Sequence, residues 1–269
     1  MVAPFVHVDA FTDVAMRGNP AAVVVLDGER DDAWLQSVAA EMNLPETAFV
    51  RPVGGGGGAW SLRWCTPTVE VELCGHATLA SAHALWELGR VPESEPIAFD
   101  TRSGRLVAAR RGARIELELP ALIVTPRDAP AAVLAALGVC ADELAFAAHH
   151  PNGYGFLVVD DADRVRALQP DFAALARHPE PFLVTAPSDH AQYDFVSRFF
   201  APSFGIDEDP VTGAAHCMLG PYWAAHLGKP VVTGFQASPR TGVVECEPRG
   251  DRVLLRGHAV TVLRGELLA

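Results

Sequence analysis

The chain repeats a sequence pattern at half its own length, and this repeat limits the folds that it can adopt. The segment RWCTPT at residues 63–68 returns as RFFAPS at residues 198–203, which is 135 residues later in a chain of 269. Upstream, a turn and an apolar run at residues 18–25 align at the same offset with residues 153–160. Solenoid repeats have periods of roughly 20 to 50 residues, so this repeat describes two domain-sized copies. We expect two topologically similar halves, with a site at their junction.

The composition agrees with two ordinary domains and excludes a nucleic-acid surface. Hydrophobic residues make up 49% of the chain and charged residues 20%, which is enough apolar material for two cores. The formal net charge is -12. Because binding to phosphate groups needs clustered Lys and Arg, we expect no nucleic-acid partner.

The cysteines and the lengths of the apolar runs indicate the cellular compartment that we expect for the protein. The five cysteines are an odd number and are scattered without a C-x-x-C pair. This pattern favours reduced thiols in the cytoplasm over a disulfide framework or a zinc site. The N-terminus contains Asp9 and no basic region, so we expect no signal peptide. No run reaches about 18 apolar residues, so we expect no membrane span.

Short apolar runs separated by Gly and Pro predict a β-rich protein. The run IELEL at residues 115–119 alternates apolar and acidic residues, which is typical of a strand with one wet face. We expect strands at residues 22–26, 61–64, 115–119, 156–159, 253–256 and 260–264. We expect helices at residues 31–42, 129–137 and 171–177, and a crossing between the halves at residues 120–130.

Two further helical segments, at residues 75–88 and 213–227, begin with glycine and consist almost entirely of small and apolar residues. A helix without a polar face is buried all round. In a β-rich domain, one wholly buried helix implies a sheet wrapped around it. The fold class that we expect is therefore α+β, with two pseudo-symmetric domains. Each domain is a curved mixed or antiparallel β-sheet or barrel around a central buried helix.

The starts of these two helices are candidate binding sites. The first backbone N–H groups of a buried helix lack helical partners and carry about half a unit of positive charge. Gly75 and Gly213 open the two helices, so a ligand can approach the backbone closely. For one helix alone, capping by a neighbour such as Thr78 or Thr212 is the simpler interpretation. For both together we favour a site for a small carboxylate.

Two polar residues near the helix starts have both a structural and a functional interpretation. Asp209 is either an acidic residue that the helix dipole favours or a carboxylate that polarises a partner. His76 stands where the dipole disfavours its protonation, so we expect a neutral ring that donates one hydrogen bond and accepts another. A lone histidine on an apolar helix is usually a satisfied core residue. We assign His83, His216 and His226 to that class.

Six sequence motifs occur in one order along almost the whole chain. They are DAF at residues 9–11 with GNP at 18–20, MNLPETAF at 42–49, TP at 66–67, CGHAT at 74–78, DPVTG at 209–213 and QASPRTG at 236–242. In these motifs the chain resembles the PhzF-like family of phenazine-biosynthesis-type isomerases, which shares the diaminopimelate epimerase fold. One motif decides little, whereas six in register are highly specific.

The resemblance implies that Glu46 is the catalytic acid/base, with His76 and Asp209 beside it as catalytic residues. A glutamate next to another carboxylate in a closed cleft has a raised proton affinity, which suits a group that takes and returns a proton. The implied substrate is a small carboxylic acid or an amino-acid-like molecule. The implied substrate-binding residues are Asn19, Gly75, Ala77, Thr212, Gly213, Ala214, Gln236 and Arg240.

The resemblance also implies an organisation and a set of partners. One epimerase-like half comprises residues 1–120, joined by the C-terminal strand 258–269, and the other comprises residues 121–257. The scheme needs no cofactor and no metal, and the family resemblance suggests a homodimer. The expected activity is a cofactor-independent proton shift.

Two departures from the family pattern bear on the chemistry. Ala214 stands where the family usually has Ser, so a hydroxyl contact to substrate is missing while the backbone donors remain. The epimerase branch has a cysteine base at the start of each central helix, and here Cys74 matches the first position but Thr212 occupies the second. A Thr hydroxyl is a far poorer base than a thiolate, which disfavours two-cysteine racemisation. An amino-acid epimerase or racemase, and a non-catalytic carboxylate-binding protein, are the alternatives.

Overall fold

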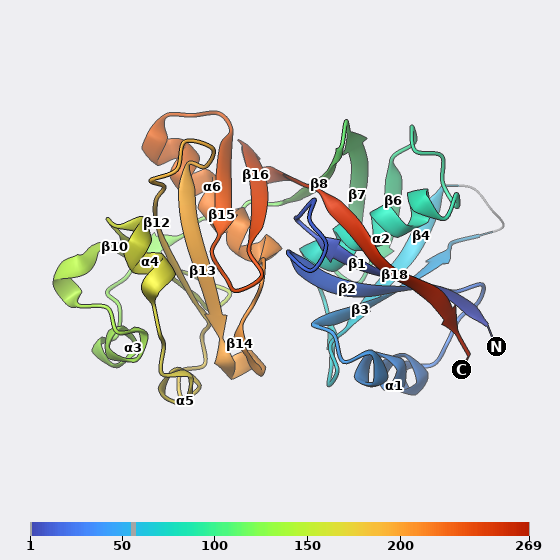
Figure 1. The fold of residues 1–269 in the computed structure, drawn as a ribbon, viewed down its shortest axis with the longest axis horizontal. Coiled ribbons are helices and arrows are strands. Elements are labelled where there is room, and N and C mark those ends of the chain that lie inside the picture. The colour runs from blue at the N-terminus through green and yellow to red at the C-terminus, as the bar shows by residue number, and fades with distance from the viewer. Residues whose placement is uncertain (1, 55–57, 269) are drawn as a thin grey trace. The chain divides into compact units, whose positions relative to one another are not determined.

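Two units make up the fold, and each is described by itself. The structure, a computed structural model, describes residues 2–54 and 58–268. Unit 1 consists of Met1–Leu119 and Leu254–Ala269, and unit 2 consists of Pro120–Val253. Both ends of the chain therefore belong to unit 1 (Figure 1). None of the helices within the described ranges is long and apolar enough to cross a membrane.

Unit 1 is built on a mixed sheet. Its strands are β1 (Ala3–Ala10), β2 (Asn19–Val25), β3 (Glu46–Pro52), β4 (Ala59–Cys65), β5 (Glu70–Val71), β6 (Ile97–Thr101), β7 (Gly104–Arg111), β8 (Arg114–Pro120) and β18 (Ala259–Leu267). β1 lies antiparallel between β18 and β2, and β2 is parallel to β3 (Figure 1). β3 is antiparallel to β4, β4 is parallel to β6, and β6, β7 and β8 form a meander.

Helix α2 (Gly75–Glu87) fills the inside of this sheet. Its residues from 76 to 82 are all buried, and it packs against β1, β2 and β3. Leu79 and Leu85 are fully buried, so truncating either to Ala should cost about 2–5 kcal/mol. The expectation of a wholly buried central helix is confirmed for this unit, because a helix of small and apolar residues has no face that prefers water.

Helix α1 (Asp32–Met42) covers the other face of the same sheet. The Asp31 carboxylate caps it by accepting from the Trp34 N–H at 2.8 Å. Its apolar stripe packs on β2, β3 and β4, with Leu35 and Val38 against Phe49. The helix ends at Asn43 in the left-handed conformation that Asn tolerates, and the chain enters β3 three residues later.

Unit 2 has a second mixed sheet with its own central helix. Its strands are β9 (Thr125–Pro126), β10 (Leu144–His150), β11 (Tyr154–Val159), β12 (Phe182–Pro187), β13 (Phe195–Ala201), β14 (Ile206–Glu208), β15 (Val232–Gln236) and β16 (Gly242–Arg249), and β17 (Arg252–Gly257) leads the chain back to unit 1. β11 is parallel to β12, β12 is antiparallel to β13, and β13 is parallel to β15. The pairing pattern of β2, β3, β4 and β6 is thus repeated.

The strand register repeats as well as the strand order. Thr47 lies opposite Cys65 in unit 1, and residues 135 positions later, Phe182 and Phe200, lie opposite each other in unit 2. The two units therefore share one topology with one register, and the repeat expected from the sequence is confirmed at the level of individual residue pairs.

Helix α6 (Gly213–Leu227) fills the inside of the second sheet and contains a proline. Pro221 stands inside the helix and has no N–H to donate to the carbonyl oxygen of Cys217. The N–H of Leu122 donates to that oxygen instead, at 3.0 Å. Gly220 lets the helix approach β16 closely, because a Cβ there would lie 2.8 Å from the Cβ of Cys246.

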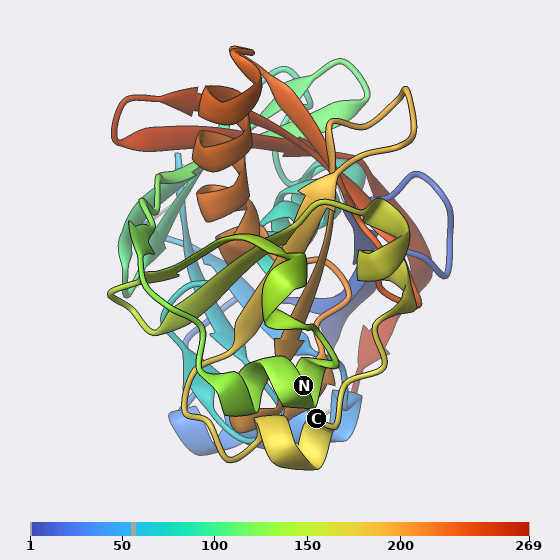
Figure 2. The ribbon, with the colours of Figure 1, turned by 90° about the vertical axis from the view of Figure 1, so that its left-hand side faces the viewer.

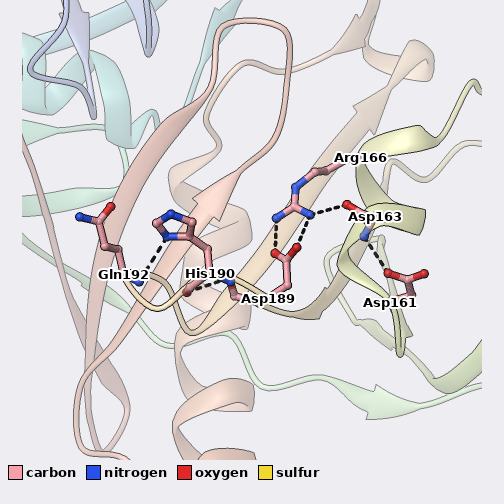
Figure 3. A network of polar contacts seen from close by, with 7 residues as sticks. Asp161, Asp163, Arg166, Asp189, His190 and Gln192 are labelled. Carbon is pink, nitrogen blue, oxygen red and sulfur yellow. Dashed lines mark hydrogen bonds and ion pairs between the residues drawn. The ribbon is translucent and has the colours of Figure 1, made fainter.

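Three shorter helices cover the outer face of the unit 2 sheet (Figure 2). They are α3 (Ala131–Leu137), α4 (Ala162–Ala167) and α5 (Phe172–Leu175), with single 3-10 turns at Ala141–Glu143 and Pro202–Phe204. Val133, Val165 and Leu175 pack against strands β11 to β13. Arg166 at the end of α4 holds the loop after β12 through Asp189 (Figure 3).

The helices of unit 2 differ in extent from those expected. The helix expected at residues 171–177 spans only Phe172–Leu175, since His178 precedes Pro179 and a residue before proline disfavours helical geometry. Helix α4 was not expected. It has six residues and is fixed by the Asp161 cap and by tertiary packing of Val165, which a periodicity argument does not detect.

Candidate active site

Glu46, the expected acid/base, is the first residue of β3 and faces the start of α2. Its side chain is 18% exposed, so it is sheltered but open to a small molecule. The Oε2 atom of Glu46 lies 3.1 Å from the Nε2 atom of His76. Residues 30 positions apart in the sequence are brought together because β3 runs parallel to β2 along the buried helix.

Asn19 holds the other side of the histidine ring. Its Nδ2 atom lies 3.2 Å from the Nδ1 atom of His76, and the Asn19 side chain is fully buried. An amide can present either its N–H or, after turning, its oxygen to the ring, so it suits both protonation states of the imidazole. This burial favours a role in positioning His76 over direct contact with substrate.

Burial alone lowers the pKa of His76, but Cys74 and the Glu46 carboxylate raise it by more, to well above 6.5. The pKa thus moves in the direction opposite to the one expected from the helix dipole. The helix dipole places only a partial positive charge near the ring, whereas Glu46 places a full negative charge in contact with it. The effect of Glu46 on the His76 pKa is therefore the larger of the two.

Cys74 precedes α2 and completes the group around the ring. Its Sγ atom lies 3.5 Å from the Nδ1 atom of His76. Burial, helped by the charge of Glu46, raises the pKa of the Cys74 thiol above 9.0. A thiol whose pKa is raised forms a thiolate less readily, which further disfavours racemisation through this cysteine.

The loop that leads from β1 to Asn19 at the start of β2 has an unusual backbone conformation. Gly18 has a φ of +65°, and a Cβ at that position would lie 2.2 Å from the carbonyl oxygen of Ala10. Phe11 is fully buried with a φ of 63°, a conformation that is rare for a bulky residue. Its N–H donates to the carbonyl oxygen of His258 at 2.8 Å. Strained backbone of this kind concentrates at functional sites.

In unit 2, the structure brings together Asp209, Thr212 and Gln236 at the start of α6. The Thr212 hydroxyl donates to the Asp209 carboxylate at 2.6 Å. The Gln236 oxygen accepts from the Thr212 N–H at 2.9 Å, and its Nε2 atom donates to the Asp209 carbonyl oxygen at 2.7 Å. Because Gln236 is fully buried with both amide atoms engaged, it positions this segment and is not suited to touch substrate.

The remaining expected residues of unit 2 lie close along the chain. Gly213 is buried at the first position of α6, and Ala214 behind it is half-buried. Arg240 is half-buried in the loop after β15. Sequence reasoning missed Ser238, whose hydroxyl donates to the Pro210 carbonyl oxygen at 2.7 Å and so fastens this loop to the start of α6.

Neither central helix has a side-chain cap. The Thr78 hydroxyl donates to the Cys74 carbonyl oxygen at 2.5 Å. It accepts no capping hydrogen bond from a backbone N–H of the first turn of α2. The Thr212 hydroxyl is engaged with Asp209. The simpler interpretation, in which Thr78 and Thr212 cap their own helices, is therefore wrong. The starts of both helices, including Gly75 and Ala77 in α2, keep their capacity to bind an anion.

The repeat shows that the acid/base group has no counterpart in unit 2. The shared register places Pro181 where unit 1 has Glu46, and the helix starts place Ala214 where unit 1 has His76. The Glu46–His76 pair therefore has no repeat-related copy in unit 2.

The same residues include a possible metal-ligating set. In the part of the chain that the structure describes, one ligand atom each from Glu46, Cys74 and His76 lie within 4.8 Å of one another. The sequence alone gave no reason to expect a metal, because these donors come from two segments and match no spacing motif.

Comparison with known proteins gives consistent results. The family model described as phenazine biosynthesis-like protein matches residues 8–265. An uncharacterized isomerase from Halalkalibacterium halodurans is 47% identical over 271 residues, which cover 100% of this chain and 99% of that protein. The crystal structure of a PhzF-family phenazine biosynthesis protein from Enterococcus faecalis is 37% identical, covers 100% of both chains and has a TM-score of 0.92.

A more distant likeness concerns the fold alone. A probable proline racemase from Agrobacterium radiobacter K84 is 12% identical, has a TM-score of 0.62 and covers 98% of this chain and 92% of that one. Together with the Enterococcus faecalis structure, this likeness confirms the expected α+β class of curved sheets around central helices.

Proposed function

Because the chain belongs to the phenazine biosynthesis-like family of isomerases, we propose that it catalyses a cofactor-independent proton shift with Glu46 as the acid/base. The proposed substrate is a small carboxylic acid or an amino-acid-like molecule. The observation that carries this proposal is the 3.1 Å contact between Glu46 and His76 at the uncapped start of α2.

In the proposed reaction, the Glu46 carboxylate removes a proton from a carbon of the substrate. The C–H bond breaks, its electron pair spreads into the adjoining carboxylate or double bond, and an O–H bond forms on Glu46. The N-terminal backbone groups of α2, at Gly75 and Ala77, stabilise the developing negative charge. Glu46 then returns the proton to a different carbon on the same face, which regenerates the carboxylate.

We assign Asp209, Thr212, Gly213, Ala214 and Arg240 to the same reaction on the strength of the family resemblance. The Thr212 hydroxyl donates to the Asp209 carboxylate and Gln236 holds the Asp209 backbone carbonyl, so the carboxylate has an orientation suited to a substrate amine or hydroxyl. We also infer from the resemblance that the protein is a cytoplasmic homodimer with halves at residues 1–120 plus 258–269 and at residues 121–257.

Proton exchange with solvent tests the role of Glu46. We would incubate the protein in deuterated water with a panel of small unsaturated and 2-amino carboxylic acids and follow deuterium uptake by proton NMR. Glu46→Gln should abolish uptake into every acid that the unaltered protein labels, and the matched control Glu29→Gln, at an exposed position, should not. Undiminished uptake by Glu46→Gln would contradict the assignment.

The same experiment separates the alternatives. Uptake with inversion at the labelled carbon, lost in Cys74→Ser, would select an epimerase or racemase. Tight binding of carboxylates without exchange into any of them would select a non-catalytic binding protein.

A further inference from the structure

We propose that Tyr154 is a further substrate-binding residue, whose hydroxyl donates a hydrogen bond to the carboxylate of a small acid while Asp209 contacts an amine or hydroxyl of the same molecule. The substrate class that this pair fits is a 2-amino or 2-hydroxy acid. The identity of the ligand as a substrate rests on the proposed function, whereas the place of Tyr154 rests on contacts within unit 2.

Tyr154 faces the central helix of unit 2. It is the first residue of β11, and side chains alternate between the two faces of a strand, so its ring lies on the same face as the ring of Phe156. The Phe156 ring packs against Tyr222 of α6, with 5.0 Å between the ring centroids. Gly155, between them, faces the outer side of the sheet, where a Cβ would lie 2.4 Å from the Phe182 ring. The Tyr154 ring therefore points to the inside of the sheet.

The backbone around Tyr154 is held by the two neighbouring strands. Tyr154 pairs with His150 of β10, and the Gly153 N–H donates to the His150 carbonyl oxygen at 2.9 Å. On the other side, the Gly155 N–H donates to the Pro181 carbonyl oxygen at 2.9 Å. A side chain on a fixed backbone needs little reorganisation to bind a ligand.

The Tyr154 ring also lies beside the strand that anchors Asp209. Its centroid is 6.1 Å from that of the Phe199 ring, and the Phe199 carbonyl oxygen accepts from the Asp209 N–H at 3.0 Å. Burial raises the pKa of Tyr154 above 10, and the charges of Cys217 and Asp209 raise it further. Cys217 stands one turn into α6. The hydroxyl is therefore near both Asp209 and the first turn of α6.

The Tyr154 hydroxyl is available as a donor. With a raised pKa it stays protonated near neutral pH, and a protonated phenol can donate one hydrogen bond. Tyr154 is half-buried, and in the part of the chain that the structure describes its hydroxyl has no hydrogen-bond partner. The hydroxyl and the Asp209 carboxylate are near each other without being hydrogen-bonded, so one small molecule can contact both.

The charge of Asp209 restricts what that molecule can be. Asp209 is 8% exposed, and its carboxylate accepts from the Thr212 hydroxyl at 2.6 Å. A ligand that presents only a carboxylate to this buried acid is repelled, whereas an amine or hydroxyl on the ligand is attracted. The Tyr154 hydroxyl then binds the ligand carboxylate, because a donor to an anion makes a short and strong hydrogen bond. A 2-amino or 2-hydroxy acid carries both groups on neighbouring carbons.

The kinetics of deuterium uptake test the contact. Tyr154→Phe removes only the hydroxyl, so for each acid that the unaltered protein labels it should raise KM about tenfold or more and change kcat less than about threefold. The primary amide of the same acid should bind the unaltered protein more weakly than the acid does, and this preference should shrink in Tyr154→Phe. An unchanged KM in Tyr154→Phe would overturn the contact.

Tyr193→Phe is the matched control. Tyr193 stacks on Phe235 at the outer face of the unit 2 sheet, with 4.9 Å between the ring centroids. Removal of its hydroxyl should change neither kcat nor KM. Equal increases of KM in Tyr193→Phe and Tyr154→Phe would show that loss of a hydroxyl acts through stability and would overturn the assignment.

Fluorine NMR tests binding without turnover. The chain has three tyrosines, Tyr154, Tyr193 and Tyr222, so protein that contains 3-fluorotyrosine gives three signals, and Tyr154→Phe identifies the signal of Tyr154. The 2-amino acids of the panel or the matching 2-hydroxy acids should move that signal, in the unaltered protein and in Glu46→Gln alike, and should leave the Tyr193 signal in place. A Tyr154 signal that no acid moves would overturn the inference, whether or not exchange occurs. A signal that moves in a protein that exchanges no tested acid would support the contact while counting against the proposed function.

Discussion

Arg198 binds Glu208 through the same atoms with which Arg63 binds Glu70 in the other unit. In each pair, the Nε atom of Arg donates to Oε1 of Glu at 2.8 Å and the Nη2 atom donates to Oε2. Both pairs join the end of a strand to the segment that leads into the central helix. A bidentate ion pair is thus common to both copies of the repeat. In each unit it holds the chain segment that precedes the central helix.

This relationship predicts a strong dependence of stability on Glu208. The Arg198 and Glu208 side chains are only 9% and 10% exposed. Glu208→Gln removes the negative charge and one of the two acceptor oxygens that face the buried guanidinium. We expect a loss of about 3 kcal/mol in the free energy of unfolding, measured by urea denaturation. Asp163→Asn, which removes an exposed partner of Arg166 (Figure 3), should leave the urea midpoint unchanged. Equal effects of the two variants would contradict the prediction.

His216 predicts how stability depends on pH. Burial lowers its pKa from 6.5 to about 4, and its Nδ1 atom lies 2.8 Å from the Thr212 carbonyl oxygen. Between these two values the unfolded chain binds more protons than the folded chain, so stability falls as the pH drops from 6.5 towards 4. The contribution amounts to about 3 kcal/mol and is fully present above pH 6.5.

The measurement is a urea denaturation series from pH 4 to pH 7.5 on the unaltered protein and on His216→Asn. Asn keeps a donor to the Thr212 carbonyl oxygen but does not titrate. The two stability curves should diverge above pH 4 and run parallel above pH 6.5. Curves that stay parallel throughout would show that His216 does not carry this dependence.

We predict that position 18 tolerates no residue larger than glycine. Gly18→Ala places a Cβ 2.2 Å from the Ala10 carbonyl oxygen and also demands a left-handed backbone, so we expect a loss of more than about 2 kcal/mol in the free energy of unfolding. Gly112→Ala is the matched control, since Gly112 has a φ of +63° with open space around it. It should cost only about 1 kcal/mol. A smaller cost for Gly18→Ala than for Gly112→Ala would refute the steric argument.

Much of the fold could be predicted from local patterns in the sequence. The two central helices were predictable because GHATLASAHALWE and GAAHCMLGPYWAAHL have no polar face, and a helix of that kind must be enclosed. The repeat was predictable because Arg63 and Arg198 stand in matching segments. Their partners Glu70 and Glu208 were missed, because the spacing from arginine to glutamate differs between the two copies.

The site was less accessible to sequence reasoning. Glu46 has no local signal of its own, since Pro45-Glu46-Thr47 resembles any strand entry, and only the family motifs singled it out. The charge state of His76 depends on a carboxylate 30 residues away in sequence, which a local dipole argument omits. Likewise, the bond from Leu122 that completes α6 at Pro221 joins segments that share no pattern.

Asn19 predicts an effect on rate that separates positioning from folding. Its amide holds the His76 ring beside Glu46, so Asn19→Ala should lower the rate of deuterium uptake at saturating substrate about tenfold or more, with little change in KM. Asn19→Asp keeps an acceptor for the ring nitrogen and should recover part of that rate, although it fills the same buried space. Asn152→Ala, at an exposed position, is the control. If Asn19→Asp were as slow as Asn19→Ala while both melted at the temperature of the unaltered protein, the contact to His76 would not be what sets the rate.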